Sequence, residues 1–298
     1  MSLEEYVSNW IAARLNLAPS TISGYLRLHR LYIAGTRVGG IQLADLKDSD
    51  MVELLRPLID RSCTRQAQLL QVLVSAALRS AVKRREIPFN PMDSIDHVKH
   101  CPRVTAWLTV DQARQLLATS AADDDPYYIA WLLMLCCGLR RGEMLALKWS
   151  DIDELRKELH IQRQVITIDG VTKVTHPKSR TSVRDIPLDD ELLSLLRLIP
   201  RSKDDTILAG VTRSKLAAGL DRALTRAQLP RVTLHGLRHT MASVAAEDGV
   251  AVKILQSLMG HAHYQTTADI YAHVNQRPRI EAARLISHSL IPARLEIV

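Results

Sequence analysis

The sequence predicts a mainly α-helical protein with a small antiparallel β-sheet, an α+β fold in two domains. Apolar residues recur at helical spacing through most of the chain, whereas residues 159–188 contain short runs that alternate with period two. A proline-rich break near residue 91 separates two helical regions. The 298 residues, 47% of them hydrophobic, are enough for two cores. We therefore expect a helical domain at 1–98, a linker at 99–106 and a second domain at 107–298.

In the first domain, helices are expected to begin near residues 2, 19, 48 and 63, with Ser2 and Pro19 as start signals for the first two. Basic residues stand outside the apolar stripes of this region. Five of them are candidates for contacts with DNA phosphates: Arg61, Arg65, Arg79, Lys83 and Arg84. An ordinary solvated helix face is the competing interpretation of each.

The second domain is expected to begin with a helix at Thr109, which forms a capping box with Gln112. Residues 127–137 are apolar nearly all round, which predicts a central helix ended by Gly138. Further helices are expected at 190–198, 213–228, 235–247, 251–259 and 267–274, with Asp189, Thr212, Thr233 and Thr266 at N-cap positions and with stops at Gly249 and Gly260.

Strands are expected between these helices. Residues 159–165 alternate between apolar and polar side chains, and Asp169-Gly170 predicts a tight hairpin between residues 166–168 and 171–174. A third strand at 183–188 is expected to complete one antiparallel sheet. The intervening turn carries Lys178 and Arg180.

Charge and composition restrict the function. The 39 Lys and Arg against 32 Asp and Glu give a net charge of +7, which is compatible with a nucleic-acid partner. The four cysteines form no CxxC pair, which indicates buried, reduced thiols. The N-terminus does not resemble a signal peptide, and the longest apolar run, residues 129–137, is too short for a membrane span. A cytoplasmic protein without a membrane partner is therefore expected.

One segment, from His235 to Tyr271, concentrates groups suited to phosphate chemistry. His235 and Arg238 share a helix face near an N-terminus, where free N–H groups favour an anion. His261 comes later, and Tyr271 follows on a short helix, whereas the rival Tyr264 is expected in a turn. This set suits the binding of a phosphodiester and its attack by a tyrosine. A capped surface helix with ordinary histidines and a core tyrosine is the alternative.

Other candidates lie earlier in the chain. Arg140 follows the turn that ends the central helix, and Glu143 is close enough to orient it, although a structural ion pair is equally compatible. Lys178 could protonate a leaving oxygen if its surroundings lower its pKa, with Lys173 as its rival. No metal site is expected, because His235 and its neighbour four residues on lack the glutamate of a zinc-protease motif.

Five motifs occur in the order found in the tyrosine recombinase (phage integrase) family, which this chain resembles over its whole second domain. The motifs are Gly138-Leu-Arg140-Arg-Gly-Glu143, Pro177-Lys178 before Arg184-Asp-Ile-Pro-Leu188, His235-Gly-Leu-Arg238-His-Thr, Leu258-Met-Gly-His261 and Ile270-Tyr271-Ala-His273. The resemblance implies a helical core-site DNA-binding domain and a catalytic domain that together clamp DNA in a C shape. The residues after His261 depart from the small residues found there in many family members.

The resemblance also implies roles. Arg140 and Arg238 would hold the scissile phosphate, and His261 would hydrogen-bond a non-bridging oxygen. His235 would act as general base, or as a phosphate ligand. Tyr271 would attack and form a 3′-phosphotyrosine.

In the same way, Lys178 would protonate the departing 5′ oxygen, and Glu143 would support the arginines. Lys173 and Arg180 are additional candidates for DNA contacts. Neither a metal ion nor another cofactor is required in this chemistry.

The implied protein is a site-specific recombinase for the integration or excision of a phage or mobile element, acting on double-stranded attachment or core sites at the bacterial nucleoid. It would work as a tetramer on two DNA sites, and an accessory DNA-bending or directionality protein of the host or phage is a further candidate partner. Its tail, residues 275–298, would dock on a neighbouring protomer, and a separate arm-binding domain is not expected. A Xer-like resolvase, a type IB topoisomerase-like enzyme and a non-catalytic DNA-binding regulator are the alternatives.

Overall fold

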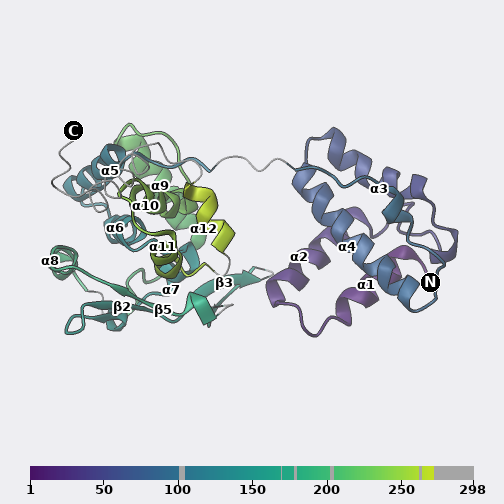
Figure 1. Ribbon diagram of the computed structural model, residues 1–298, viewed down its shortest axis with the longest axis horizontal. Coiled ribbons are helices and arrows are strands. Elements are labelled where there is room, and N and C mark those ends of the chain that lie inside the picture. Colours follow the sequence, from purple (N-terminus) through teal and green to yellow (C-terminus); the bar gives the residue numbers. More distant parts are fainter. Residues whose placement is uncertain (101–104, 169, 178–179, 202–204, 262–263, 272–298) are drawn as a thin grey trace, which may run out of the picture. The chain divides into compact units, whose positions relative to one another are not determined.

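Figure 1 shows the computed structural model, which describes residues 1–100, 105–168, 170–177, 180–201, 205–261 and 264–271. The chain forms two compact units, the first made mainly of residues 1–103 and the second mainly of residues 104–298. Each unit has its own hydrophobic core. Helices dominate and small antiparallel sheets accompany them, so the predicted fold class is confirmed. The tail at 275–298 lies outside the described residues.

The described residues of the first unit form the α-helices α1 (Leu3–Ala12), α2 (Pro19–Tyr32), α3 (Asp48–Asp60) and α4 (Thr64–Lys83). Ser2 caps α1 as expected, since its hydroxyl accepts a hydrogen bond from the Glu5 amide while the Glu5 carboxylate accepts one from the Ser2 amide. The apolar stripe of α4 is buried and packs against α1, α2 and α3. This helix therefore forms the centre of the first core.

In the second unit, α5 (Val110–Ala122), α6 (Tyr128–Cys136) and α7 (Arg141–Ala146) come first. The prediction of a central helix is confirmed, because α6 is buried almost all round and packs against α5, α7 and α10 (Leu234–Glu247). Gly138 ends this region with a left-handed backbone, φ +60°. A side chain there would also collide with Met241. The turn that precedes Arg140 is thus shaped by a position that requires glycine.

Within the described residues the strands form two sheets, so the prediction of one sheet is wrong. Strands β1 (Ile152–Asp153), β2 (Glu158–Ile161) and β5 (Arg184–Pro187) make one antiparallel sheet in the order β1-β2-β5. The hairpin of β3 (Gln164–Ile168) and β4 (Val171–Thr175) forms as predicted but stands apart. Both edges of β2 are occupied, by β1 and by β5, so this strand has no free edge on which β3 could pair.

The remaining helices are α8 (Asp190–Leu198), α9 (Arg213–Arg226), α10, α11 (Val252–Met259) and α12 (Tyr264–Tyr271). Asp189, Thr212 and Thr233 cap α8, α9 and α10 as predicted. Two expectations for α12 are wrong: Thr266 lies within the helix and is not its N-cap, and Tyr264 begins the helix and does not lie in a turn. Packing of α12 against α10 and α11 decides where it begins, and this overrides the local capping preference. No helix in the described ranges is long and apolar enough to cross a membrane.

Replacing Trp131 by alanine should lower the free energy of unfolding of the second unit by about 3–5 kcal/mol, the usual cost of emptying a large buried site. Trp131 lies in α6 and is 0% exposed, and its indole N–H donates to the buried Asp125 carboxylate at 3.4 Å. Denaturant unfolding will measure the change. The control is Leu155→Ala, because this leucine is 98% exposed and its loss should change stability by less than about 0.5 kcal/mol. Equal effects of the two substitutions would contradict the prediction.

Candidate active site

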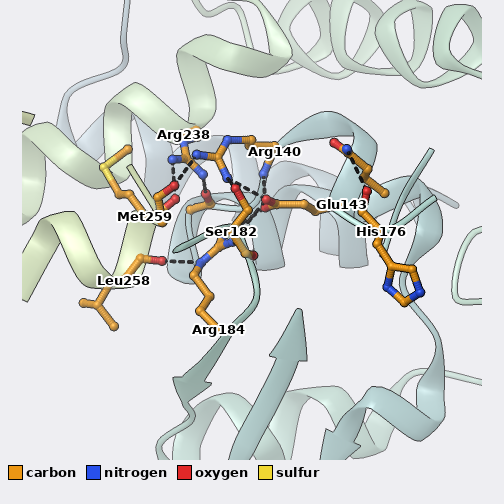
Figure 2. Close-up of polar contacts among 11 residues, drawn as sticks. Arg140, Glu143, His176, Ser182, Arg184, Arg238, Leu258 and Met259 are labelled. Carbon is orange, nitrogen blue, oxygen red and sulfur yellow. Dashed lines mark hydrogen bonds and ion pairs between the residues drawn. The ribbon is translucent and has the colours of Figure 1, made fainter. Parts of the chain in front are cut away.

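Arg140 is placed by the first turn of α7, where it is the N-cap residue. Its guanidinium donates to the Glu143 carboxylate at 2.8 Å and to the Gly260 carbonyl at 2.6 Å (Figure 2). The first contact lies within its own turn, whereas the second joins it to the end of α11. About a third of the side chain remains exposed, so that it can still reach a ligand.

Arg238 comes from the first half of α10 and is 1% exposed. Its two terminal nitrogens donate to the carbonyls of Gly138 and Met259, each at 2.6 Å. The Nε–H group of this arginine has no hydrogen-bond partner in the described parts of the chain. Burial, followed by the charge of Arg140, lowers its pKa to about 9. A buried cation with an unused donor is suited to an anionic ligand.

Glu143 is the carboxylate at this centre, and it is 2% exposed. It accepts hydrogen bonds from the backbone and guanidinium of Arg140, and also from both terminal nitrogens of Arg184 at 3.1 and 3.0 Å. Burial alone would raise its pKa, but hydrogen bonds and charge from the arginines hold the pKa below its ordinary value. Glu143 is therefore an ionised partner shared by two arginines.

Sequence reasoning missed Arg184 as a member of this group. The sequence places it in a strand and in the second of the five motifs but assigns it no role, although the strand pattern contains a usable signal. In β5, Ile186 is buried, and residues two apart in a strand face the same side, so Arg184 should also point inward. A buried arginine requires a partner, and Glu143 is that partner.

His235 lies in the first turn of α10, and its ring contacts that of His239 edge-on with the centroids 5.1 Å apart. Partial burial, followed by the electrostatic influence of His239, Arg238 and Arg140, lowers the pKa of His235 to about 4. The imidazole is therefore neutral at pH 7 and can accept a proton.

His261 follows the left-handed Gly260 at the end of α11, and its Nδ1 lies 2.9 Å from the hydroxyl oxygen of the buried Thr267 in α12. Burial, then the charges of Arg238 and Arg140, lowers the pKa of His261 to about 3. At neutral pH this ring is also uncharged. It retains one N–H that can donate to an oxygen.

These pKa values predict how the rate of the reaction falls at acidic pH. The second-order rate of DNA cleavage at low protein concentration should stay constant down to about pH 5 and fall only near pH 4, where the free enzyme's His235 becomes protonated. An ordinary histidine would give a fall near pH 6.5. A midpoint near 6.5 in rates measured between pH 4 and 8 would contradict the prediction.

The same pKa values predict the direction in which the free energy of unfolding changes with pH. Between pH 6.5 and about 4 the unfolded chain binds protons that the folded histidines do not, so the free energy of unfolding should decrease as the pH falls through this window.

The structure describes the other predicted residues to different extents. Lys178 lies outside the described residues, and the side chain of Arg180 is also undescribed. Tyr271 ends α12, a helix that packs against α10, which carries His235, and against α11, which precedes His261. Lys173 is exposed on β4, and Tyr264, at the opposite end of α12 from Tyr271, is 53% exposed.

The five basic candidates of the first unit are all exposed. Arg79 forms a 3.4 Å ion pair with Asp93, and Arg65 donates to Gln68 at 2.6 Å. Both contacts are solvent-exposed and cost little to exchange for a phosphate. Their role in DNA binding stays a prediction.

Among the described residues, the group of side chains close enough to share a metal ion is Glu158, His160 and Asp185, on β2 and β5. His160 Nδ1 already lies 2.6 Å from an Asp185 oxygen as a paired contact. This group contains none of the residues predicted to act on phosphate.

A buried and a partly exposed arginine beside two neutral imidazoles, next to a helix that ends in tyrosine, define a centre that can bind a phosphodiester. Residues 106–277 match the family model described as "Phage integrase family". The chain belongs to this family and is therefore a tyrosine recombinase, an enzyme of site-specific DNA recombination.

Known proteins agree with this assignment. The chain is 25% identical to a tyrosine recombinase XerC-like protein of Caldanaerobacter subterraneus subsp. tengcongensis, over 98% of this chain and 84% of the relative. The chain covers a smaller share of other curated relatives, down to 47% of a relative's length.

In fold, the chain is similar to the Tn1549 transposon integrase solved with a circular intermediate DNA, with a TM-score of 0.79 at 24% identity over 96% of this chain and 99% of that one. It is also similar to a lambda integrase tetramer bound to a Holliday junction, with a TM-score of 0.70 at 20% identity over 100% and 81% of the two chains.

Proposed function

We propose that the chain cleaves and rejoins duplex DNA through a 3′-phosphotyrosine formed by Tyr271. The observation that carries this proposal is the joint placement of Arg140 and Arg238 at the end of α11, beside two histidines that are neutral at pH 7. Two guanidinium groups can neutralise the charge of a scissile phosphate without a metal ion.

In the proposed step, the phenol oxygen of Tyr271 attacks phosphorus and the bond between phosphorus and the 5′ oxygen breaks. The phenol proton passes to His235, whose lowered pKa keeps it able to accept one. Lys178 donates a proton to the departing 5′ oxygen. Arg140, Arg238 and His261 bind the non-bridging oxygens, and the phosphotyrosine conserves the bond energy for rejoining.

We propose integration or excision of a mobile element as the biological reaction, with the duplex held by both units. The likeness to an integrase of a transposon, solved with circular intermediate DNA, supports the reaction class. A tetramer acting on two DNA sites is supported by the likeness to the lambda integrase tetramer on a Holliday junction. The exposed basic residues of the first unit would supply phosphate contacts.

The test is a nicked duplex that carries the boundary sequence of the element encoding the chain. Cleavage near the nick releases a short 5′-hydroxyl strand, so the covalent intermediate accumulates. We expect an adduct in denaturing gels, and mass spectrometry should find the nucleotide on Tyr271. An active chain that relaxes supercoils but does not recombine two sites would favour a topoisomerase-like function. Specific DNA binding without any adduct would favour a regulator.

A further inference from the structure

Three successive carbonyl groups at the end of α11 each accept a hydrogen bond from a different arginine. Arg184 donates from Nε to Leu258 at 2.7 Å, Arg238 donates to Met259 at 2.6 Å, and Arg140 donates to Gly260 at 2.6 Å (Figure 2). The last carbonyls of a helix lack partners within the helix, and cations are favoured at this end. The arginines come from β5, α10 and the start of α7, so the end of α11 joins three separate segments.

Arg184 differs from the other two arginines in its accessibility. Its side chain is 6% exposed, whereas that of Arg140 is 32% exposed. The Arg184 guanidinium donates four hydrogen bonds to groups of the protein. Two go to the carbonyls of Leu258 and Ser182, and one goes to each carboxylate oxygen of Glu143. Its donors are thus directed at protein groups, and it is not placed to bind DNA itself.

Glu143 connects Arg184 to Arg140. One carboxylate oxygen accepts from the terminal nitrogens of both arginines, at 2.8 Å from Arg140 and 3.1 Å from Arg184. The other oxygen accepts from the Arg140 amide and from Arg184. Loss of Arg184 would remove one of the two contacts on each oxygen, so that Arg140 alone would hold the buried carboxylate.

The backbone at Gly260 provides independent evidence of close fit. Gly260 has φ +62°, and a Cβ atom there would lie 2.7 Å from the Thr181 carbonyl and 3.2 Å from the Arg184 side chain. The Arg184 side chain therefore packs against the turn at Gly260, and His261 follows this turn directly. Arg184 thus contacts both Glu143 and the end of α11 that leads into this turn.

We propose that Arg184 is a positioning residue that aligns Arg140, through Glu143, and His261, through the end of α11, for action on the scissile phosphate. The inference rests on the function proposed above. A misalignment of about 1 Å can cost on the order of 100-fold in rate.

Arg184→Met and Arg184→Lys test the proposal. We expect Arg184→Met to slow single-turnover cleavage of the nicked duplex by about 100-fold at saturating protein, while the dissociation constant for DNA changes less than about 3-fold. Arg184→Lys keeps the charge but cannot contact Glu143 and Leu258 together, so it should recover part of the rate. It also serves as the folded variant if the methionine variant is unstable.

The matched control is Arg226→Met. Arg226 ends α9 in the same unit and pairs with Asp123 and the buried Asp125, which are not members of the arginine centre. We expect it to lower the thermal midpoint while leaving the cleavage rate of the folded protein within about 3-fold of the original. Equal effects of the two methionine substitutions on cleavage would mean that Arg184 contributes only a structural ion pair. This result would overturn the proposal.

A double-mutant cycle and a measurement without DNA complete the test. In an Arg140→Ala background, Arg184→Met should slow cleavage much less than it does alone, because its main target is absent; full additivity overturns the proposal. In the free protein, the NMR signals of the Arg140 Nε–H group and the His261 ring should shift and broaden in Arg184→Lys. Unchanged signals overturn the proposal whether or not the chain forms an adduct, so the result is separate from failure of the proposed function.

Discussion

Replacing Tyr271 by phenylalanine should eliminate the covalent protein–DNA adduct and reduce strand cleavage by a factor on the order of 10⁶, the loss found when an enzyme's nucleophile is removed. The substitution deletes one oxygen and keeps the ring. Because α12 packs against α10 and α11, the helix itself should remain in place. DNA binding is therefore expected to persist, and the measurements are adduct yield on the nicked duplex and affinity by mobility shift.

Tyr264→Phe is the control on the same helix. Tyr264 begins α12 and Tyr271 ends it, so the seven-residue separation corresponds to about 10 Å along the axis and only one of the two can occupy a given site. Its 53% exposure predicts little effect of the substitution on stability or cleavage. An adduct that survives Tyr271→Phe and disappears with Tyr264→Phe would reverse the assignment of the nucleophile.

Replacing Lys178 by alanine should slow cleavage by about 10²- to 10⁴-fold, the usual contribution of a general acid. A substrate in which sulfur replaces the 5′ bridging oxygen should restore the rate, because a thiolate leaves without a proton. The measurement is the ratio of cleavage rates on the oxygen and sulfur substrates, for the variant and for the original protein.

The matched control is Lys173→Ala, which removes an exposed lysine from the β3-β4 hairpin. We expect this variant to lose some DNA affinity but to show the same ratio of rates as the original protein. If sulfur restores Lys173→Ala and leaves Lys178→Ala slow, Lys173 is the general acid. If sulfur restores neither slow variant, the proton comes from another group.

Local patterns were sufficient for most elements of the fold. The helix cap at Ser2, the capping box at Thr109, the apolar helix α6 and the hairpin at β3-β4 depend on contacts between residues close in sequence, and each formed as predicted. Sheet pairing was predicted wrongly because it depends on which edges of β2 remain free, and β1 and β5 occupy both. The start of α12 was wrong for a similar reason, since its packing on α10 and α11 outweighs a capping preference.

The sequence alone determined the family and the candidate catalytic residues, because the motifs of Arg140, His235, Arg238, His261 and Tyr271 occur in order at the family's spacing. Only the tertiary structure decided how these groups are charged and held. The neutral state of both histidines results from burial beside Arg140 and Arg238, which lie far from His261 in sequence. The contacts of Arg184 join β5, α7 and α11, and no local pattern specifies such a meeting. Long-range packing determines the electrostatic environment, and with it the chemistry that the motifs can perform.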